Sequence, residues 1–384
     1  MMKRLSKNLW RLSLALPCMM LAMGCEGNDA AETENNEPIE LRISPKVAAT
    51  RSVIQGGTQS GTGTNVMQNV VVYATGTDYT ADKSNNHAVY TQKSDGSGWE
   101  NNGASKIYLT NAEATIYAYY PAYQINTTDG SMGTTPISIS GDFSTSSTIN
   151  VSTLAEGTIT PADNADGQAN DITAPSSATE KPIAAAPGET DYMYATSKKA
   201  SNASGQSSIE LTMNHALSMI SFRVYKGNTY MGPGKLTKIV MKYNDSSAST
   251  PTTTEETATA ATGTMKIADG EITPSTTAAT YIRTIGTEGY TIPETAANAY
   301  KFSILVLPTT TSIGSTIGVT FTIDNTKYTT TLTAPATNDS NSGHLLPGKN
   351  YLYTVNLSGT ELTISKVEVT AWSEVVVNGD LNIQ

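Results

Sequence analysis

Apolar and polar side chains alternate in short runs along most of this chain. The alternation is strict over residues 39–43, whose apolar members are Ile39, Leu41 and Ile43, and again over residues 209–213. A repeat of two places every second side chain on one face of a β-strand. Both runs therefore predict half-buried strands.

Further strands are predicted by apolar runs that end at turn residues. They cover residues 66–74, 106–109, 114–120, 191–195, 220–224, 238–243, 302–307, 319–323, 328–332 and 352–357. Polar residues 324–327 predict a hairpin turn between two of these strands. Residues 246–264 are of low complexity and predict a loop. In residues 362–371 the apolar parity shifts at Ser365 and Lys366, as a bulge would cause. Helical periodicity is scarce, so the chain is predicted to be all-β.

Length and composition predict two domains. A chain of 384 residues can form two sizeable cores. The polar break at residues 197–207 divides it into a first domain at residues 52–207 and a second at residues 208–384. The formal charge of −10 argues against a nucleic-acid surface. Since both cysteines, Cys18 and Cys25, precede these domains, burial and sheet hydrogen bonds must stabilise them.

Residues 1–24 are predicted to be a signal peptide, because a basic start precedes an apolar run too short to span a bilayer. The run closes on LAMGC, which resembles the lipobox of bacterial lipoproteins and implies cleavage before Cys25 and its acylation. Leu21 stands four residues before the cysteine, whereas that family usually has the aliphatic residue three before. Plain secretion is the alternative. Acidic, Asn-rich residues 26–38 predict a disordered tether.

Several strand ends carry motifs that resemble those of the fimbrillin, or Mfa-like, family. The motifs are IYAYYP at residues 116–121, DYMYA at 191–195, the strand–His215-Ala216–strand pattern, PGKNY at 347–351 and I-x-x-V-x-V-x-x-W at 364–372. The resemblance runs from Cys25 to Trp372. It implies two transthyretin-like β-sandwich domains in tandem, preceded by a lipoprotein signal and a tether.

The resemblance also implies a precursor that an arginine-specific protease cuts after its first strand. The matching arginine here is Arg51, because Arg42 lies within the predicted strand. Residues 25–51 would then be a tether and a removable strand. Loss of that strand, with Ile39, Leu41 and Ile43, would open a groove in the first domain.

The tail of a neighbouring subunit could fill this groove by strand addition. The donor residues would be Trp372, Val375, Val377, Leu381 and Ile383. Repetition of such a head-to-tail contact gives an open filament. The leading hypothesis is a structural or adhesive subunit of a type V fimbria, made as an outer-membrane lipoprotein precursor and exported to the cell surface. Its partners would be other copies or paralogous subunits, the protease, the membrane lipid and a host or microbial surface ligand.

Two alternatives keep the same fold. One is a surface lipoprotein that never polymerises and binds glycans, with Tyr79, Tyr90 and Tyr123 as exposed stacking residues. The other is an anchor subunit that keeps its lipid and its first strand. Both leave Cys25 as the lipid attachment site.

Catalysis, cofactors and metals are not expected. The three histidines lie far apart in the sequence, and His215 is expected to be a turn or core residue. GHLLPGKN at residues 343–350 nearly fits a phosphate loop, but it lacks the final hydroxyl and precedes a predicted strand. DNADGQAND at residues 163–171 fails the register of a calcium-binding EF-hand loop.

Overall fold

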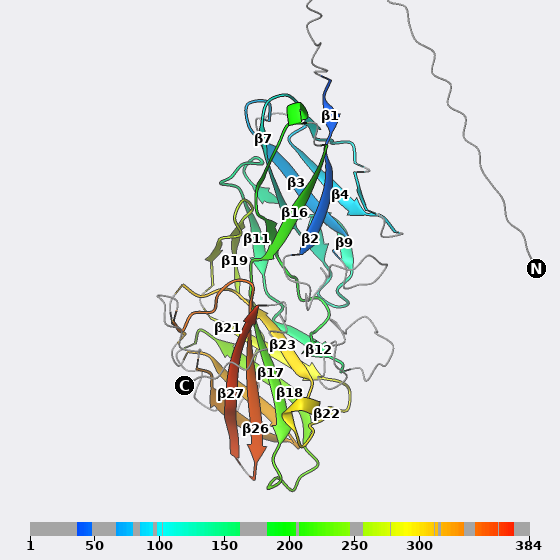
Figure 1. Cartoon of the computed structure of the whole chain (residues 1–384). Helices are drawn as coiled ribbons and strands as arrows, with labels where there is room; N and C mark the ends of the chain where they lie inside the picture. The colour runs from blue at the N-terminus through cyan, green and yellow to red at the C-terminus, as the bar shows by residue number, and fades with distance from the viewer. Residues whose placement is uncertain are drawn as a thin grey trace, which may run out of the picture. The chain divides into compact units, whose positions relative to one another are not determined.

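The computed structural model describes residues 37–47, 67–79, 85–94, 98–101, 103–161, 183–204, 207–245, 256–276, 278–310, 312–313, 316–333, 342–359 and 361–371. Within these ranges, β-strands are joined by loops and by two single-turn 3-10 helices, η1 (Asn202–Ser204) and η2 (Ala296–Asn298) (Figure 1). The all-β prediction is confirmed. Cys25, Arg51 and the predicted donor residues from Trp372 onward lie outside the described residues.

The N-terminal part forms an eight-stranded sheet. Its order is β2 (Arg42–Val47), β16 (Ser208–His215), β14 (Met193–Ala195), β7 (Ala114–Tyr120), β3 (Asn69–Thr75), β4 (His87–Gln92) and β5 (Trp99–Glu100), with β15 (Lys198–Ala200) also paired to β7. Beside it, β1 (Ile39–Glu40) pairs with β6 (Tyr108–Leu109). One face of the sheet contributes Val70, Val72, Ile116 and Leu211 to a buried cluster. The alternating pattern thus places its apolar side chains on a core-facing surface.

Two sheets form a sandwich in the C-terminal part. One sheet has the order β12 (Glu156–Ile159), β21 (Ala279–Ile285), β18 (Lys235–Tyr243), β24 (Gly318–Ile323) and β25 (Thr326–Thr331), with β22 (Tyr290–Thr291) on β18. The other has the order β13 (Ile183–Ala184), β23 (Lys301–Val306), β17 (Ser218–Lys226), β26 (Lys349–Ser358) and β27 (Glu361–Ala371). The rings of Phe222 and Phe321, one from each sheet, meet edge to face with centroids 5.4 Å apart. Their contact marks the core between the sheets.

Strand pairing crosses the predicted domain boundary between residues 207 and 208 in both directions. β16 follows the boundary but pairs with β14 and β2, whereas β12 and β13 precede it but pair with β21 and β23. A smaller sheet also draws on both sides, in the order β10 (Ile139–Ser140), β11 (Thr148–Ser152), β19 (Thr262–Lys266) and β20 (Ile272–Pro274). β8 (Tyr123–Ile125) and β9 (Met132–Pro136) form a separate two-stranded sheet. The two-domain division stays a prediction.

Local features agree closely with the sequence pattern. The predicted hairpin is present, and its loop is the pair Asp324 and Asn325, with φ of 49° and 63°. The predicted bulge is confirmed as well, because the β26–β27 register skips Ser365. The loop expected at residues 246–264 is wrong at its end, where β19 begins at Thr262, and residues 246–255 lie outside the described residues.

Candidate functional site

Strand β2 and the residue before it contribute to the buried cluster of the N-terminal sheet. From Leu41, which directly precedes β2, to the end of the strand, every second residue is buried: Leu41 is 1% exposed, Ile43 and Val47 are each 5% exposed, and Pro45 is also buried. Ile39 is 38% exposed. Of the three apolar residues expected in this strand, the structure therefore buries Leu41 and Ile43, whereas Ile39 lies at the surface.

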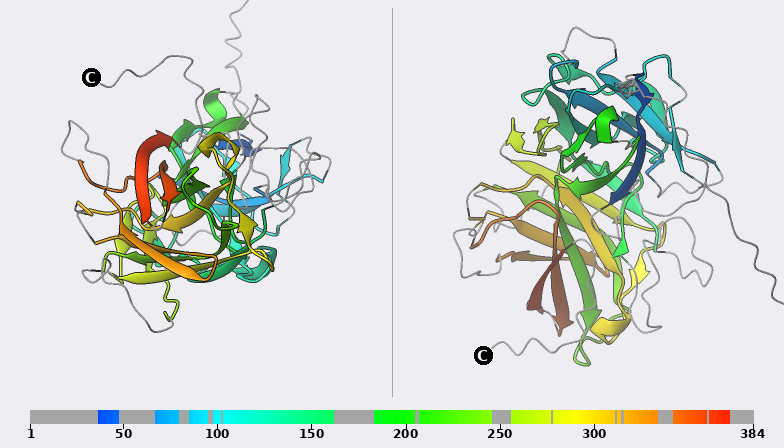
Figure 2. Two further views of the ribbon diagram at one scale, coloured as in Figure 1. Left: turned by 90° about the horizontal axis from the view of Figure 1, so that it is seen from below. Right: turned by 45° about the horizontal axis from the view of Figure 1, so that its top comes forward.

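β2 occupies an edge of the sheet and pairs with β16 (Figure 2). The pairing is parallel and sets Ile43 opposite Ile209, and Val47 opposite Met213. Between them lies Pro45, which has no N–H to donate and is compatible with an edge position. An edge strand that includes proline is bound to its sheet less firmly than a central strand would be.

Buried polar contacts fix where this strand sits. The Tyr90 hydroxyl donates to the backbone oxygen of Leu41 at 2.7 Å, and the Leu41 N–H donates to the Ile107 oxygen at 2.9 Å. The Arg42 N–H donates to the Ser207 oxygen at 2.6 Å. Burial, with a smaller contribution from the Glu40 charge, raises the pKa of Tyr90 far above its usual range. Tyr90 therefore stays a neutral phenol that can donate.

Surface ion pairs add little to this attachment. Lys106 Nζ lies 3.0 Å from Glu40 Oε2, and Lys46 Nζ lies 2.5 Å from Glu210 Oε2. All four side chains are well exposed. Exposed pairs contribute about 0–1 kcal/mol. Burying an aliphatic side chain such as Leu41 or Ile43 contributes about 1.5–3 kcal/mol. Apolar burial therefore dominates the binding of the strand.

At the other end of the described chain, β27 leads toward the tail. It lies at the edge of its sheet and pairs with β26 along its whole length. Val369 on this strand is 40% exposed. Beside it, Glu368 Oε2 lies 3.1 Å from Arg223 Nη2. The donor residues proposed from the sequence begin one position after β27 ends, outside the described residues.

The other candidate residues have structural environments. Tyr79 and Tyr90 are buried, so the expectation that they are exposed for stacking on sugars is wrong. Tyr123 is half-buried against the core. His215 is buried, as expected for a core histidine, and its Nδ1 lies 2.8 Å from Asp191 Oδ2. This partner is not predicted from the sequence, because Asp191 precedes the histidine by 24 positions.

The described residues lack two further kinds of feature, a metal site and a membrane-spanning helix. These residues contain no group of three or more side chains placed to hold a metal ion. None of their helices has the length and apolar character needed to cross a bilayer. Residues 343–350 lead into strand β26 rather than a helix, in agreement with rejection of a phosphate loop.

The described part of the chain is all-β, and its N-terminal edge strand contributes to a buried core. The chain belongs to the fimbrillin-like family, whose pattern matches residues 158–372. The motif resemblance is thus confirmed by a match over more than half of the chain. No curated protein sequence matches.

Solved structures with a similar fold include three from Bacteroides species. A candidate cell adhesion protein from Bacteroides uniformis matches with a TM-score of 0.50 and 16% identity, covering 88% of this chain and 99% of the other. A candidate cell adhesion protein from Bacteroides ovatus has a TM-score of 0.49 and 16% identity, with 88% and 98% covered. A fimbrial protein from Bacteroides vulgatus has a TM-score of 0.44 and 14% identity, with 88% and 99% covered. At these identities the likeness concerns the fold alone.

Proposed function

We propose that this chain is a structural or adhesive subunit of a surface fimbria that polymerises by strand exchange. The observation that carries the proposal is the position of β2 in its sheet. It contributes buried side chains to a core yet pairs with a single neighbour, β16, in the described sheet. It ends at Val47, four positions before Arg51. A cut after Arg51 would leave the strand attached only through non-covalent contacts.

The tail has the pattern needed to replace β2. Val375, Val377, Leu381 and Ile383 are separated by even numbers of positions, so in an extended strand they share one face. The buried residues of β2 are likewise separated by two positions. Without β2, the backbone of β16 and the cluster beneath it would form an apolar groove open to strand addition. The tail of a second copy or of a paralogous subunit would fill it.

The maturation route follows from the N-terminus. A lipid on Cys25 would hold the precursor at the outer membrane during export to the cell surface, because several acyl chains anchor a protein stably. An arginine-specific protease would then release residues 25–51 together with the lipid. The mature subunit would start at Ser52 and join the fimbria, where it could meet a host or microbial surface ligand. A mature protein that starts at Cys25 would instead indicate an anchor subunit.

The test is cleavage of the purified, unlipidated precursor by an arginine-specific protease. We expect a ladder of oligomers that resist SDS at room temperature, because each junction would bury a full strand. Arg51→Ala should abolish the ladder, whereas Arg42→Ala should preserve it. Truncation after Ala371 should also abolish it while the cut subunit stays folded by circular dichroism. A verified cut at Arg51 that yields only monomers would overturn strand exchange and favour a non-polymerising surface protein.

A further inference from the structure

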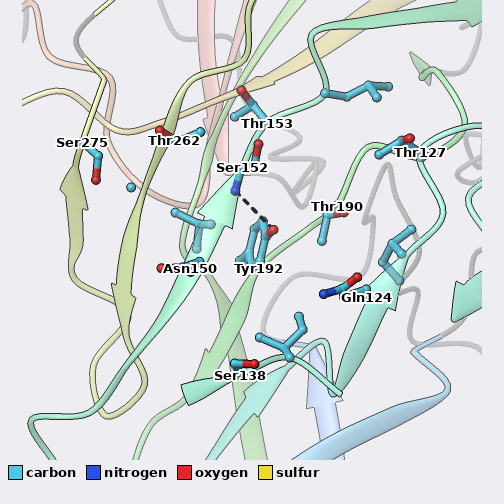
Figure 3. Close-up of a pocket in the computed structure, with 16 residues that line it drawn as sticks. Gln124, Thr127, Ser138, Asn150, Ser152, Thr153, Thr190, Tyr192, Thr262 and Ser275 are labelled. Atoms are coloured by element: carbon cyan, nitrogen blue, oxygen red, sulfur yellow. Dashed lines mark hydrogen bonds between the residues drawn. The ribbon is translucent and has the colours of Figure 1, made fainter. Parts of the chain in front are cut away.

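A cavity of about 560 Å³ opens beside strands β11 and β19 (Figure 3). Its walls come from five parts of the chain: β8 with the residues after it, the segment before β10, β11 with its following turn, residues 188–192, and the β19–β20 hairpin. The volume lies in the range of roughly 300–1,000 Å³ that is typical of small-molecule sites. It is separate from the position of β2, whose residues do not line it.

The cavity lining is polar but carries no formal charge. Gln124 and Asn150 contribute carboxamides, Ser138, Ser152 and Thr190 contribute hydroxyls, and Tyr192 contributes a phenol. Aliphatic side chains complete the lining, and among its described residues no Asp, Glu, Lys, Arg or His occurs. Such a lining offers many hydrogen-bond donors and acceptors, and apolar surface between them.

One wall is an alternating segment, residues 188–192. Gly188, Thr190 and Tyr192 line the cavity, whereas the side chains of Glu189 and Asp191 are buried in the protein. Asp191 meets His215, and Glu189 meets Arg283. A segment with two buried acidic side chains, each paired with a basic residue, is held in one conformation. The residues that line the cavity are thereby held in place.

Arg283 joins this wall to the next one. Its Nε donates to Glu189 Oε1 at 3.0 Å, and its Nη2 donates both to Glu189 and to the backbone oxygen of Leu154, the latter at 2.9 Å. Leu154 itself lines the cavity. A fully buried guanidinium therefore orders two walls at once. Breaking a buried pair of this kind is costly, which makes the cavity a pre-formed rather than an adaptable site.

Tyr192 makes a third connection. Its hydroxyl accepts a hydrogen bond from the Ser152 N–H at 3.2 Å, as Figure 3 shows. Burial raises the pKa of Tyr192, while the hydrogen bond from Ser152 opposes the rise. The phenol therefore keeps its proton at neutral pH and can donate a hydrogen bond to a ligand.

We propose that this cavity binds a short neutral oligosaccharide. A neutral sugar presents hydroxyls that both donate and accept and C–H faces that are apolar, and the lining matches both. Phosphate, sulfate, carboxylate or ammonium groups would lose their hydration without meeting an opposite charge. The site would give the subunit a ligand-binding activity that does not require polymerisation.

Binding is tested on the intact, uncut chain, so that the result is independent of strand exchange. Short neutral oligosaccharides of hexoses and N-acetylhexosamines, and their sulfated counterparts, are presented on an array and then titrated by calorimetry. We expect a neutral oligosaccharide to bind and its sulfated form to bind at least tenfold more weakly. Asn150→Ala and Ser138→Ala should each weaken binding about two- to tenfold, the effect of one neutral hydrogen bond.

The matched control is Ser140→Ala. Ser138 and Ser140 are both exposed serines two positions apart, but only Ser138 lines the cavity. Ser140→Ala should therefore bind like the unaltered chain, and all variants should keep the unaltered melting temperature. The proposal is overturned if no neutral oligosaccharide binds, if Asn150→Ala and Ser138→Ala bind unchanged, or if only sulfated sugars or peptides bind.

Discussion

At the scale of single residues, Tyr90 helps to hold β2 in its position. Its ring lies in the buried cluster, and its hydroxyl reaches the backbone of Leu41 rather than a side chain. A contact with backbone does not depend on which side chain stands at that position. The same hydroxyl could therefore donate a hydrogen bond to any strand that places a carbonyl there, which makes Tyr90 a positioning residue in the proposed exchange.

Tyr90→Phe should lower the free energy of unfolding of the precursor by about 1–2 kcal/mol, because the buried Leu41 oxygen loses its donor. Urea denaturation measures this change. After cleavage at Arg51, the released strand should also dissociate faster than from the unaltered protein. Tyr108→Phe is the control, since the Tyr108 side chain is 38% exposed and its loss of a hydroxyl should change stability by less than about 0.5 kcal/mol. If Tyr90→Phe left the midpoint of urea denaturation unchanged, Tyr90 would not be a positioning residue.

At the scale of elements, the sequence predicted those strands that pack β-branched and aromatic residues densely. β7 was predicted with its observed bounds, and the β27 bulge was found from apolar parity alone. β19 was missed because its Thr-rich sequence is as typical of loops, and its pairing with β11 lies more than a hundred positions away. β21 is not predicted, because an arginine near the middle of a strand suggests an exposed position. In the structure Arg283 is buried, and its ion pair with Glu189 makes that burial possible.

The candidate site was only partly accessible from sequence. The alternation placed Leu41 and Ile43 in a strand, but it could not show which strand pairs with them or that Pro45 is buried. The burial of Tyr90 is not predicted, because residues 87–92 read as a loop, whereas the structure places them in β4. The cavity was not foreseen, since its walls are separated in sequence and meet only through tertiary contacts.

The β24–β25 hairpin has a turn whose stability depends on pH. Asp324 accepts hydrogen bonds from the Tyr230 hydroxyl at 2.5 Å and from the N–H groups of Gly234 and Lys235, each at 2.8 Å. Burial raises the pKa of Asp324, but these hydrogen bonds and the Lys226 charge outweigh it and lower the pKa. The folded state therefore holds a proton here less readily than the unfolded state does.

Stability from Asp324 is thus present above the usual carboxyl pKa, about 3.9, and is lost as pH falls through the lower folded value. Asp324→Asn keeps the side-chain shape and tolerates the positive φ, but it removes the charge. We expect its melting temperature to be below that of the unaltered chain at pH 7 and to approach it as pH falls below about 4. Melting curves between pH 3 and pH 7 measure the difference. A constant difference across that range would show that the charge contributes nothing.

At the scale of the whole molecule, the Arg283–Glu189 pair connects segments that lie 94 positions apart. Both side chains are fully buried, and the Leu305 N–H donates to the second carboxylate oxygen at 3.2 Å. Arg283 also reaches the carbonyls that follow β11. The pair therefore links β21, β23 and the segment before β14 in one buried network.

Arg283→Met should destabilise the protein by about 3–5 kcal/mol, because it leaves the Glu189 carboxylate buried without its partner. Glu189→Gln combined with Arg283→Met should be less destabilised than Arg283→Met alone, since the orphaned charge is gone. Guanidinium denaturation of the unaltered chain, both single variants and the double variant gives the coupling energy. A cost below about 1 kcal/mol for Arg283→Met would mean that the pair is not a structural link.

The direction of β2 has a consequence for any fibre this subunit builds. Because β2 runs parallel to β16, a replacement that keeps the same backbone ladder must enter with the same orientation. Every junction would then repeat one orientation, so the two tips of the fibre could not be alike: one would expose a vacant acceptor and the other a loose donor. A subunit that joins at one tip would therefore insert its donor, whereas one that joins at the other tip would offer its acceptor.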